Sequence, residues 1–394
     1  MFSNIPPVIL LLGVVLGALS WLIPGLVLFH AAGPYDLGTD WLVFYGAGRA
    51  VLNGNIELLF SPEQFTDYLN STFSWWFSGP LQLHPWIYPP TYLLLVLPFC
   101  KLSFVGAYAA FELMSAALLA AALTFGFGSA HLRRVTVVFV LLSPAAALNV
   151  LQGQNGFLTA ALLVGGWRAL RWSPVLGGAL LGALTFKPQF WVLVPLALVA
   201  CREWKAILAA VSMAALLAGT SAALFGIDLW LRWIEFVLHP SADWIANGRI
   251  FGTSLYAFLL KAGVAERYAE AAQTGAAVLS ALSVYAACAL PLARDQKLAV
   301  ILAATLFAAP HSSYYDSILL ATAAALWALA DVKEGRTLWR WECALFAWAA
   351  PFFEMIVKKG FMPWLTAAFI AVMMIDYYRV SRPRAWSLPE TPSD

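Results

Sequence analysis

Residues 174–200 have the sequence PVLGGALLGALTFKPQFWVLVPLALVA, which contains one charged residue, Lys187. A charge inside such an apolar run is costly in a bilayer and usually serves a function. Pro188 follows it directly, and a proline inside a helix removes a backbone hydrogen bond and breaks the helix. The stretch therefore predicts two short membrane segments, 174–187 and 188–200, that meet at Lys187 in place of one kinked helix.

The composition of the whole chain agrees with a membrane protein. Of the 394 residues, 62% are hydrophobic and 11% are charged, whereas a soluble domain has about 25% charged residues. These values exclude an ordinary soluble domain, and the 14% aromatic content excludes a disordered chain. A net charge of +2 provides no basic surface for nucleic acid. The four cysteines form no Cys-x-x-Cys pair and the five histidines no His-Glu-x-x-His motif, so neither a disulfide framework nor a metal site is predicted.

Twelve apolar segments are candidates for membrane helices, which need about 20 apolar residues each. They are 7–29, 103–126, 134–150, 155–170, 174–187, 188–200, 206–226, 270–292, 297–310, 313–331, 338–356 and 361–380. We therefore predict an all-α polytopic membrane protein with about twelve transmembrane helices (11–13). Residues 88–100 are predicted to form a re-entrant or half-depth piece on the outer side rather than a full crossing.

Lysine and arginine residues predict the orientation, because cytoplasmic loops carry an excess of both. With the N-terminus inside, 14 of the 23 fall in the cytoplasm. The polar features then collect on the outer face: loop 30–87, the turns 151–155 and 186–189, loop 227–269, and the turns 310–316 and 354–359. Any chemistry is therefore expected at the outer membrane boundary. Residues 1–380 are predicted to be one transmembrane domain, and 381–394 a cytoplasmic tail rich in Pro and Ser.

The first outer loop, 30–87, is acidic and aromatic. Within it, residues 39–53 predict a helix that starts at an N-cap, Thr39 or Asp40, and stops at Asn53–Gly54. Its apolar face is expected to lie on the bilayer surface, as interfacial helices do. Asp40 has two compatible interpretations: a helix cap, or a general base at the place where a substrate would arrive.

Other polar residues have equally open roles. Lys187 is either a point charge for a phosphate or a lysine that snorkels to the interface. The side chains of the turn 151–155 either bind sugar hydroxyls or satisfy their own backbone. The turn 310–316 either places an imidazole and hydroxyls at a phosphate or is only a polar turn. In the stretch 84–90, either Tyr88 or His84 lines a polar pocket, or Trp86 and Tyr88 belong to an aromatic belt. Glu112 is an intramembrane carboxylate, functional or paired with a neighbouring helix.

Several short motifs, in order, resemble those of a known family. They are DWLVFYGAGRAVLNG (40–54), WIYPP (86–90), NVLQGQN (149–155), FKPQ (186–189) and APHSSYYD (309–316). The chain resembles the polyprenol-phosphate-mannose-dependent α-mannosyltransferase family of the GT-C superfamily of integral-membrane glycosyltransferases, over about residues 5–330.

The resemblance implies a GT-C fold and an inverting transfer of a hexose, mannose in this family, from a polyprenyl-phosphate donor to a glycolipid or glycan acceptor. The transfer would occur on the outer side of a bacterial inner membrane, with no cofactor and with the protein a monomer among membrane lipids. Asp40 takes the family's base position. The donor phosphate would meet Lys187, His311 and Arg249. Sugar and acceptor would be bound by a third set of residues: Tyr45, Tyr88, Gln152, Gln154, Asn155 and Tyr314.

Two other functions remain open at this stage. A transporter or flippase of lipid-linked glycans would have a charged path across the whole bilayer and usually inverted repeats, neither of which is visible in the sequence. A polymerase or ligase of O-antigen type would also have about twelve spans, but such proteins rely on basic loop residues, and the first loop here is acidic.

Overall fold

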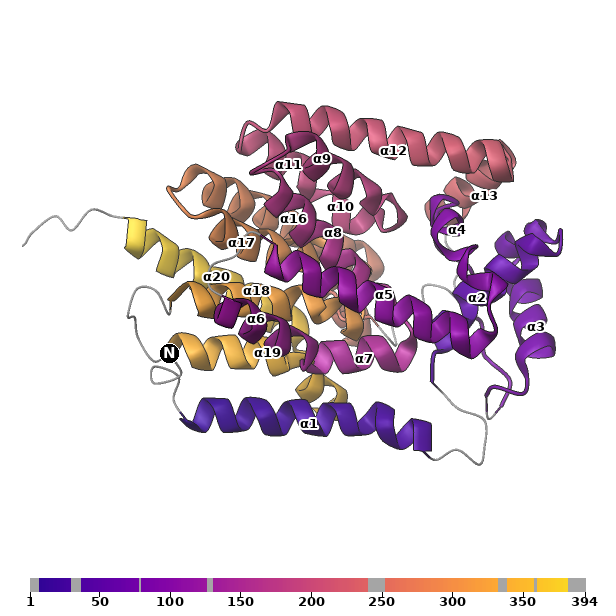
Figure 1. The fold of residues 1–394 in the computed structure, drawn as a ribbon, viewed down its shortest axis with the longest axis horizontal. Coiled ribbons are helices and arrows are strands. Elements are labelled where there is room, and N and C mark those ends of the chain that lie inside the picture. Colours follow the sequence, from indigo (N-terminus) through magenta and orange to yellow (C-terminus); the bar gives the residue numbers. More distant parts are fainter. Residues whose placement is uncertain are drawn as a thin grey trace, which may run out of the picture.

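The computed structural model describes residues 7–29, 37–77, 79–125, 130–239, 252–331, 339–357 and 360–381. Throughout these ranges the chain is helical, with connecting loops and no strand (Figure 1). The helices are α1 (Pro7–Phe29), α2 (Thr39–Leu52), η2 (Ile56–Phe60), α3 (Pro62–Phe73), α4 (Thr91–Val96), η3 (Phe99–Lys101), α5 (Phe104–Thr124), α6 (Ala130–Leu141), α7 (Pro144–Gln152), α8 (Gly156–Ala169), α9 (Pro174–Gly182), η4 (Ala183–Phe186), α10 (Pro188–Trp191), α11 (Leu193–Ala200), α12 (Trp204–Phe225), α13 (Ile227–Leu238), α15 (Leu255–Lys261), α16 (Glu266–Ala289), α17 (Arg294–Ala308), η5 (Tyr314–Ser317), α18 (Ile318–Asp331), α19 (Trp339–Val357) and α20 (Met362–Ser381).

The described parts of the twelve predicted segments are mainly helical, but segment 134–150 is divided into α6 and α7 and segment 188–200 into α10 and α11. Three of the described helices, α5, α12 and α16, are by themselves long and apolar enough to cross a bilayer. Helices α6 and α7 pass the same test together but meet at an angle of 55°. These apolar helices indicate a membrane protein. The number of membrane crossings is still a prediction. The segment 88–100 contains only the short α4 and η3, as expected of a piece that does not cross.

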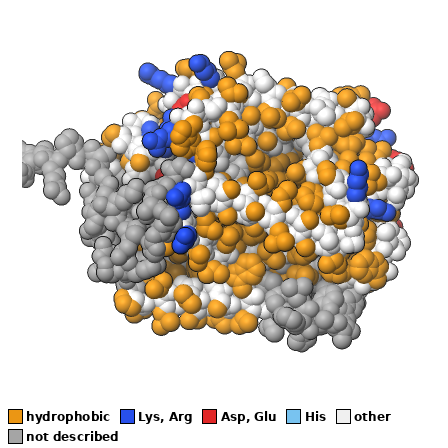
Figure 2. All heavy atoms as spheres, viewed as in Figure 1, with side chains coloured by type: hydrophobic (Ala, Val, Ile, Leu, Met, Phe, Trp, Pro, Cys, Tyr) orange, Lys and Arg blue, Asp and Glu red, His pale blue; other side chains and the backbone are white. Residues whose placement is uncertain are grey.

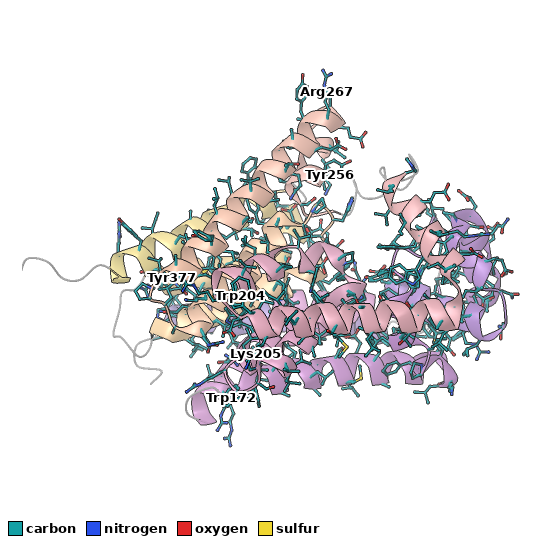
Figure 3. All side chains as sticks on the ribbon, turned by 90° about the horizontal axis from the view of Figure 1, so that it is seen from above. Trp172, Trp204, Lys205, Tyr256, Arg267 and Tyr377 are labelled. Atoms are coloured by element: carbon teal, nitrogen blue, oxygen red, sulfur yellow. The ribbon has the colours of Figure 1, made fainter. Side chains whose placement is uncertain are left out.

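The basic connectors gather at one end of the molecule. The guanidinium of Arg168, at the end of α8, pairs with the carboxylate of Asp295 at 3.0 Å. Arg294, next to it, pairs with Glu203 at 2.7 Å. Figure 3 shows Trp172 projecting at the same end as Trp204 and Lys205. On the face shown in Figure 2, lysine and arginine lie toward the two ends of the long axis, and the middle is mostly apolar.

Several polar turns are joined by hydrogen bonds, and the end of α7 lies near α2 (Figure 1). Asp40 is hydrogen-bonded to Gln154, and Lys187 is paired with Asp316. The backbone N–H of Thr253 donates to the carbonyl of Ser312 at 2.8 Å. Polar features that are distant in the sequence are therefore neighbours, as the predicted topology requires.

Residues 174–200 turn back at Lys187, as predicted. Helix η4 ends at Phe186 and α10 begins at Pro188. Arg168, before this stretch, and Glu203, after it, both pair with the start of α17, so the chain returns to the end from which it came. The segment Pro174–Phe186 is about 20 Å long at 1.5 Å per residue, which is shorter than the bilayer core of about 30 Å.

Two apolar clusters form the interior. The larger joins the helices from α5 to α20. The smaller is mainly aromatic and contains α2, where Trp41 stacks on Phe111 with ring centroids 4.9 Å apart. The prediction that the apolar face of α2 lies on the bilayer surface is wrong, because Trp41 to Gly48 are all buried. Helix α13 instead exposes apolar residues, among them Leu231 and Leu238.

Candidate functional site

The turn 151–155 between α7 and α8 is the centre of the site. Gly153 ends α7 in the left-handed conformation, with φ of 70°. A Cβ at this position would lie 2.4 Å from Cβ of Trp41 and 2.7 Å from the ring of Tyr108, so glycine meets both the conformational and the steric requirement. The backbone N–H of Gly38 donates to the carbonyl of Leu151 at 2.7 Å. The turn is therefore held directly against the start of α2.

Asp40 faces this turn. Nε2 of Gln154 donates to Oδ2 of Asp40 at 2.9 Å. The predicted N-cap role of Thr39 or Asp40 is wrong: Gly38 is the N-cap, with φ of 68°, and no side chain caps the helix. The predicted end at Asn53 is confirmed, because Asn53 is the C-cap. Burial raises the pKa of Asp40 above its ordinary value of 3.8, and the Gln154 hydrogen bond partly opposes this.

Tyr88, from the segment before α4, and Asn155 both contact the side chain of Gln154 in this turn. The hydroxyl of Tyr88 donates to Oε1 of Gln154 at 3.3 Å, and the backbone N–H of Asn155 donates to the same oxygen at 3.1 Å. The Asn155 side chain is fully buried beside the hydroxyls of Tyr88 and Tyr92, yet neither of its amide atoms has a well-formed hydrogen bond. A buried amide without partners is unfavourable, so a bound hydroxyl could stabilise it.

Lys187 is not the lone ammonium that its sequence context suggested. Its Nζ lies 2.7 Å from Oδ1 of Asp316, and both side chains are almost fully buried. The other oxygen of Asp316 accepts from the backbone N–H of Ser313 at 2.9 Å. The rings of Phe190 and Tyr315 lie 5.3 and 5.2 Å from Nζ. The ammonium therefore has a carboxylate and two ring faces as neighbours.

Three further charged or titratable groups act on Asp40. His84 and Lys187 lower its pKa, and Asp316 raises it. The sequence had offered His84, together with Tyr88, as a possible lining of a polar pocket, whereas Asp316 was not among the predicted site residues. The signal for Asp316 was available, because a lysine buried in a membrane protein needs a carboxylate partner and the turn 310–316 contains only one.

The other predicted site residues lie elsewhere or outside the described part. The Tyr45 hydroxyl donates to the carbonyl of Leu102 at 2.8 Å inside the aromatic cluster. Gln152 has a buried Oε1 without a partner. His311 is exposed and packs edge-on against Tyr256. Tyr314 is half-buried at the start of η5. Arg249 lies outside the described residues.

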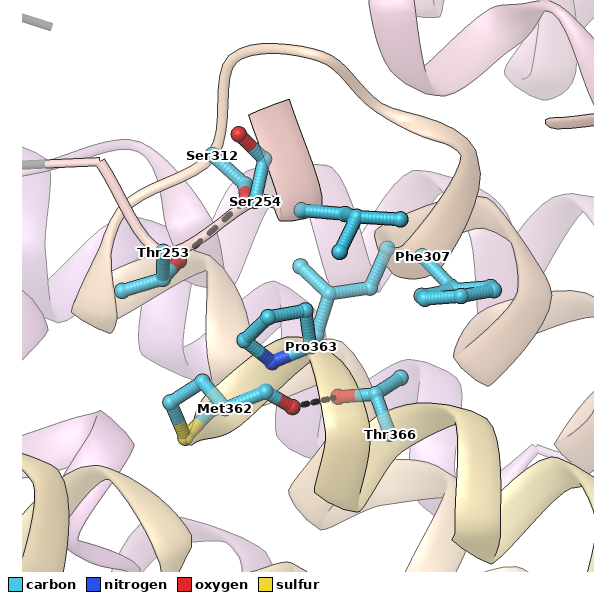
Figure 4. Close-up of a pocket in the computed structure, with 9 residues that line it drawn as sticks. Thr253, Ser254, Phe307, Ser312, Met362, Pro363 and Thr366 are labelled. Carbon is cyan, nitrogen blue, oxygen red and sulfur yellow. Dashed lines mark hydrogen bonds between the residues drawn. The ribbon is translucent and has the colours of Figure 1, made fainter. Parts of the chain in front are cut away.

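A small cavity of about 10 Å³ lies behind the turn 310–316 (Figure 4). Thr253, Ser254 and Ser312 line it, and Thr253 Oγ1 lies 3.2 Å from Ser312 Oγ. Its volume suffices for about one water molecule and is too small for a sugar. Among the described residues, no group of three or more His, Cys, Asp or Glu side chains gathers as metal ligands would.

Helices long enough to span a bilayer, with polar turns joined at one end, define an integral-membrane protein with a polar site. The chain belongs to glycosyltransferase family 87, whose family model matches residues 86–313, more than half of its length. It is therefore a membrane glycosyltransferase. The match covers Tyr88, the turn 151–155 and Lys187, whereas Asp40 and Asp316 lie outside it. No curated protein and no solved structure matches the chain.

Proposed function

We propose that this enzyme is an inverting glycosyltransferase that moves a hexose, mannose in the first instance, from a polyprenyl-phosphate donor to a lipid or glycan acceptor. The reaction would take place on the extracytoplasmic side of a bacterial inner membrane. The proposal rests chiefly on Asp40, a carboxylate that Gln154 holds at the polar end of the helices. The family supports a glycosyltransferase over the flippase considered above.

Asp40 is the proposed general base. It would take the proton from an acceptor hydroxyl, whose oxygen then attacks the anomeric carbon while the bond to the phosphate oxygen breaks. Burial raises the pKa of Asp40, and a more basic carboxylate accepts a proton more readily. One carboxylate oxygen accepts from Gln154, which orients the group and leaves the other oxygen for the acceptor.

The leaving group, a polyprenyl phosphate, is already an anion and needs electrostatic stabilisation more than a proton. Lys187 is the proposed main source, together with His311 and Arg249. Lys187 is already neutralised by Asp316 at 2.7 Å. A donor phosphate would therefore share the ammonium with Asp316, and the pair would fix the position of the charge before the donor binds.

The sugar and acceptor would be bound around the turn 151–155. Gln154, Tyr88 and Asn155 already form one hydrogen-bonded group there. The unpartnered amide of Asn155 and the unpartnered Oε1 of Gln152 supply donors and an acceptor for sugar hydroxyls. Tyr45 and Tyr314, predicted from the sequence for the same role, do not belong to this hydrogen-bonded group, and the hydroxyl of Tyr45 donates to the carbonyl of Leu102.

The proposed architecture is a single transmembrane domain, residues 1–380, with extracytoplasmic loops 30–87 and 227–269 and a cytoplasmic tail 381–394. In this arrangement the donor keeps its polyprenyl chain in the bilayer, and only its phosphate and sugar reach the polar turns. A monomer suffices, because the proposed base and the proposed phosphate ligands come from the same chain.

The test is transfer from a radiolabelled polyprenyl-phosphate-mannose donor to membrane acceptors by purified enzyme in proteoliposomes. Asp40→Asn keeps an oxygen that can accept from Gln154 but cannot act as a base, and we expect its turnover to fall by about 10²- to 10⁴-fold. The matched control is Asp67→Asn, which alters an exposed carboxylate on α3 and should leave turnover unchanged. Near-normal turnover of a folded Asp40→Asn enzyme would remove Asp40 from the base role.

A set of labelled donors tests the remaining parts of the proposal. Polyprenyl phosphates that carry mannose, glucose or arabinofuranose compete for the same enzyme, and mannose should be used best. Release of free polyprenyl phosphate accompanies transfer, whereas a flippase would move the intact donor without releasing it. Extension of a long glycan chain in place of a single sugar addition would instead favour the polymerase or ligase alternative.

A further inference from the structure

Glu112 is a buried carboxylate that the mechanism above does not use. It lies on α5 and is 6% exposed. Its Oε2 accepts from Nδ2 of Asn149 at 3.0 Å, whereas Oε1 is buried without a hydrogen-bond partner in the described structure. A buried carboxylate in a membrane helix is energetically costly and therefore usually has a functional role. The hydrogen bond from Asn149 is the one well-formed side-chain contact that the described structure gives this carboxylate, and it indicates the role of Glu112.

Asn149 joins the two helices that flank the turn 151–155. Its side-chain oxygen accepts from the backbone N–H of Gly156, the first residue of α8, at 2.8 Å. Its backbone carbonyl accepts from the N–H groups of Gly153 and Gln154 at 2.9 and 3.0 Å. An asparagine amide has one donating and one accepting end. Because the carboxylate of Glu112 accepts a hydrogen bond, the NH₂ end of the Asn149 amide faces Glu112. The oxygen end of the same amide then faces the N–H of Gly156.

Helix α5 holds the turn at a second point. Tyr108, one helical turn before Glu112, donates its hydroxyl to the carbonyl of Val150. From the turn, the side chain of Gln154 reaches Asp40. A continuous series of hydrogen bonds therefore leads from Glu112 through Asn149 and the turn to Asp40.

We infer that Glu112 is a positioning residue for Asp40, acting through Asn149, which fixes the backbone of the turn 151–155 and thereby the side chain of Gln154. The inference rests on the proposed function, because it supposes that Asp40 is the base. It assigns a role to the one buried carboxylate of α5 without any contact between that carboxylate and the substrates.

The first test compares two substitutions at position 112. Glu112→Gln keeps an oxygen that can accept from Asn149, whereas Glu112→Leu keeps the approximate size but accepts nothing. We expect Glu112→Leu to lower kcat on the order of 10- to 100-fold, as misplacement of a reacting group does, with KM for the donor within about twofold of normal. Glu112→Gln should stay close to the unaltered enzyme. Ser115→Ala removes a buried hydroxyl that donates to the backbone carbonyl of Glu112 at 3.1 Å and leaves the carboxylate in place, so it is the matched control.

The pH profile separates positioning from a merely structural role. The hydrogen bond from Gln154 lowers the pKa of Asp40. If Glu112→Leu displaces Gln154, that effect is lost, and the acid limb of kcat/KM should move to higher pH. Gln154→Leu should give the same displacement, and the double variant should be no worse than Gln154→Leu alone. An unchanged acid limb in a folded Glu112→Leu enzyme would overturn the inference.

An exchange of donor and acceptor keeps the test decisive if Glu112→Leu does not fold. Asn149→Asp places two carboxylates face to face and should lower kcat and move the acid limb. Glu112→Gln combined with Asn149→Asp restores one donor and one acceptor with their positions exchanged, and should recover both values. If the double variant recovers neither, the inference fails. If Asp40→Asn is itself active, the proposed function fails instead, so the two failures are distinguishable.

Discussion

The ammonium of Lys187 lies 2.7 Å from a carboxylate oxygen of Asp316, although the two residues are 129 positions apart in the chain. Lys187 directly follows η4, and Asp316 lies in η5. The pair therefore connects two of the polar turns inside the protein. Because both side chains are almost fully buried, each charge depends on the other for its stability.

Removing one member of this pair should destabilise the protein. Lys187→Met leaves Asp316 as an uncompensated buried charge, and we expect a loss of about 3–5 kcal/mol in the free energy of unfolding. The double variant Lys187→Met/Asp316→Leu should recover most of that loss. Denaturation by SDS in mixed micelles measures both values. Equal stability of the single variant and the unaltered protein would show that the pair does not hold its charges as described.

Asp40→Asn should make the protein more stable at neutral pH. The pKa of Asp40 is raised in the folded state, so the unfolded chain loses its proton at lower pH than the folded one. Stability is therefore fully present below the ordinary pKa of about 3.8 and is lost as the pH rises through the folded value. Asparagine never ionises and avoids this loss. The stabilisation by Asp40→Asn should thus disappear in acid, as unfolding midpoints at several pH values would show.

Helices α9 and α12 pack with their backbones in contact at two glycines. A Cβ at Gly178 would lie 2.2 Å from the carbonyl oxygen of Ala206, and one at Gly182 would lie 2.3 Å from that of Ala210. Small residues four apart permit this close approach in membranes. Gly178→Ala should therefore separate the helices and lower the unfolding midpoint. Gly219→Ala, on α12, meets no atom within 4 Å and should be neutral or slightly stabilising.

The sidedness of the molecule can be tested with single cysteines in a background where the four native ones are replaced. Asn53 and Arg171 are both exposed and lie at opposite ends of the proposed topology. Asn53→Cys should react with a membrane-impermeant maleimide added to cells whose outer membrane alone has been opened. Arg171→Cys should react only after the inner membrane is also opened. The reverse pattern would invert the proposed orientation and place the site in the cytoplasm.

Much of the fold could be predicted from the sequence, because apolar length and helix breakers act locally. Pro188 beside Lys187 predicted the break that separates η4 from α10. Asn53 marked the end of α2. The orientation argument also predicted that Asp40 and the turn 151–155 lie at one end, and their hydrogen bond agrees with it. The number of crossings and the roles of the site residues remain predictions.

The errors arise where a tertiary contact decides the outcome. The apolar face of α2 suggested a helix on the bilayer surface, but Phe44 and its neighbours pack against Trp86 and Tyr92 instead. The N-cap position of α2 is occupied by Gly38, and no side chain caps the helix. The N–H of Gly38 donates to the carbonyl of Leu151, a residue more than a hundred positions away in the sequence. Asp316, the partner of Lys187, was indicated only by the general need of a buried lysine for a carboxylate and not by local spacing. The spacing of apolar residues describes one helix at a time. It cannot identify which distant side chain pairs with a buried charge.

The shortness of Pro174–Phe186 has a consequence for the route of each reactant. In the proposed topology the segment starts at one surface of a hydrocarbon layer of about 30 Å, and with a length of about 20 Å it would stop about 10 Å before the opposite surface. Water-soluble molecules that approach Lys187 from that side must descend through this depth, whereas an isoprenoid already dissolved among acyl chains reaches the same level by lateral diffusion. The geometry therefore favours reactants that arrive from within the leaflet over those that arrive from the aqueous phase.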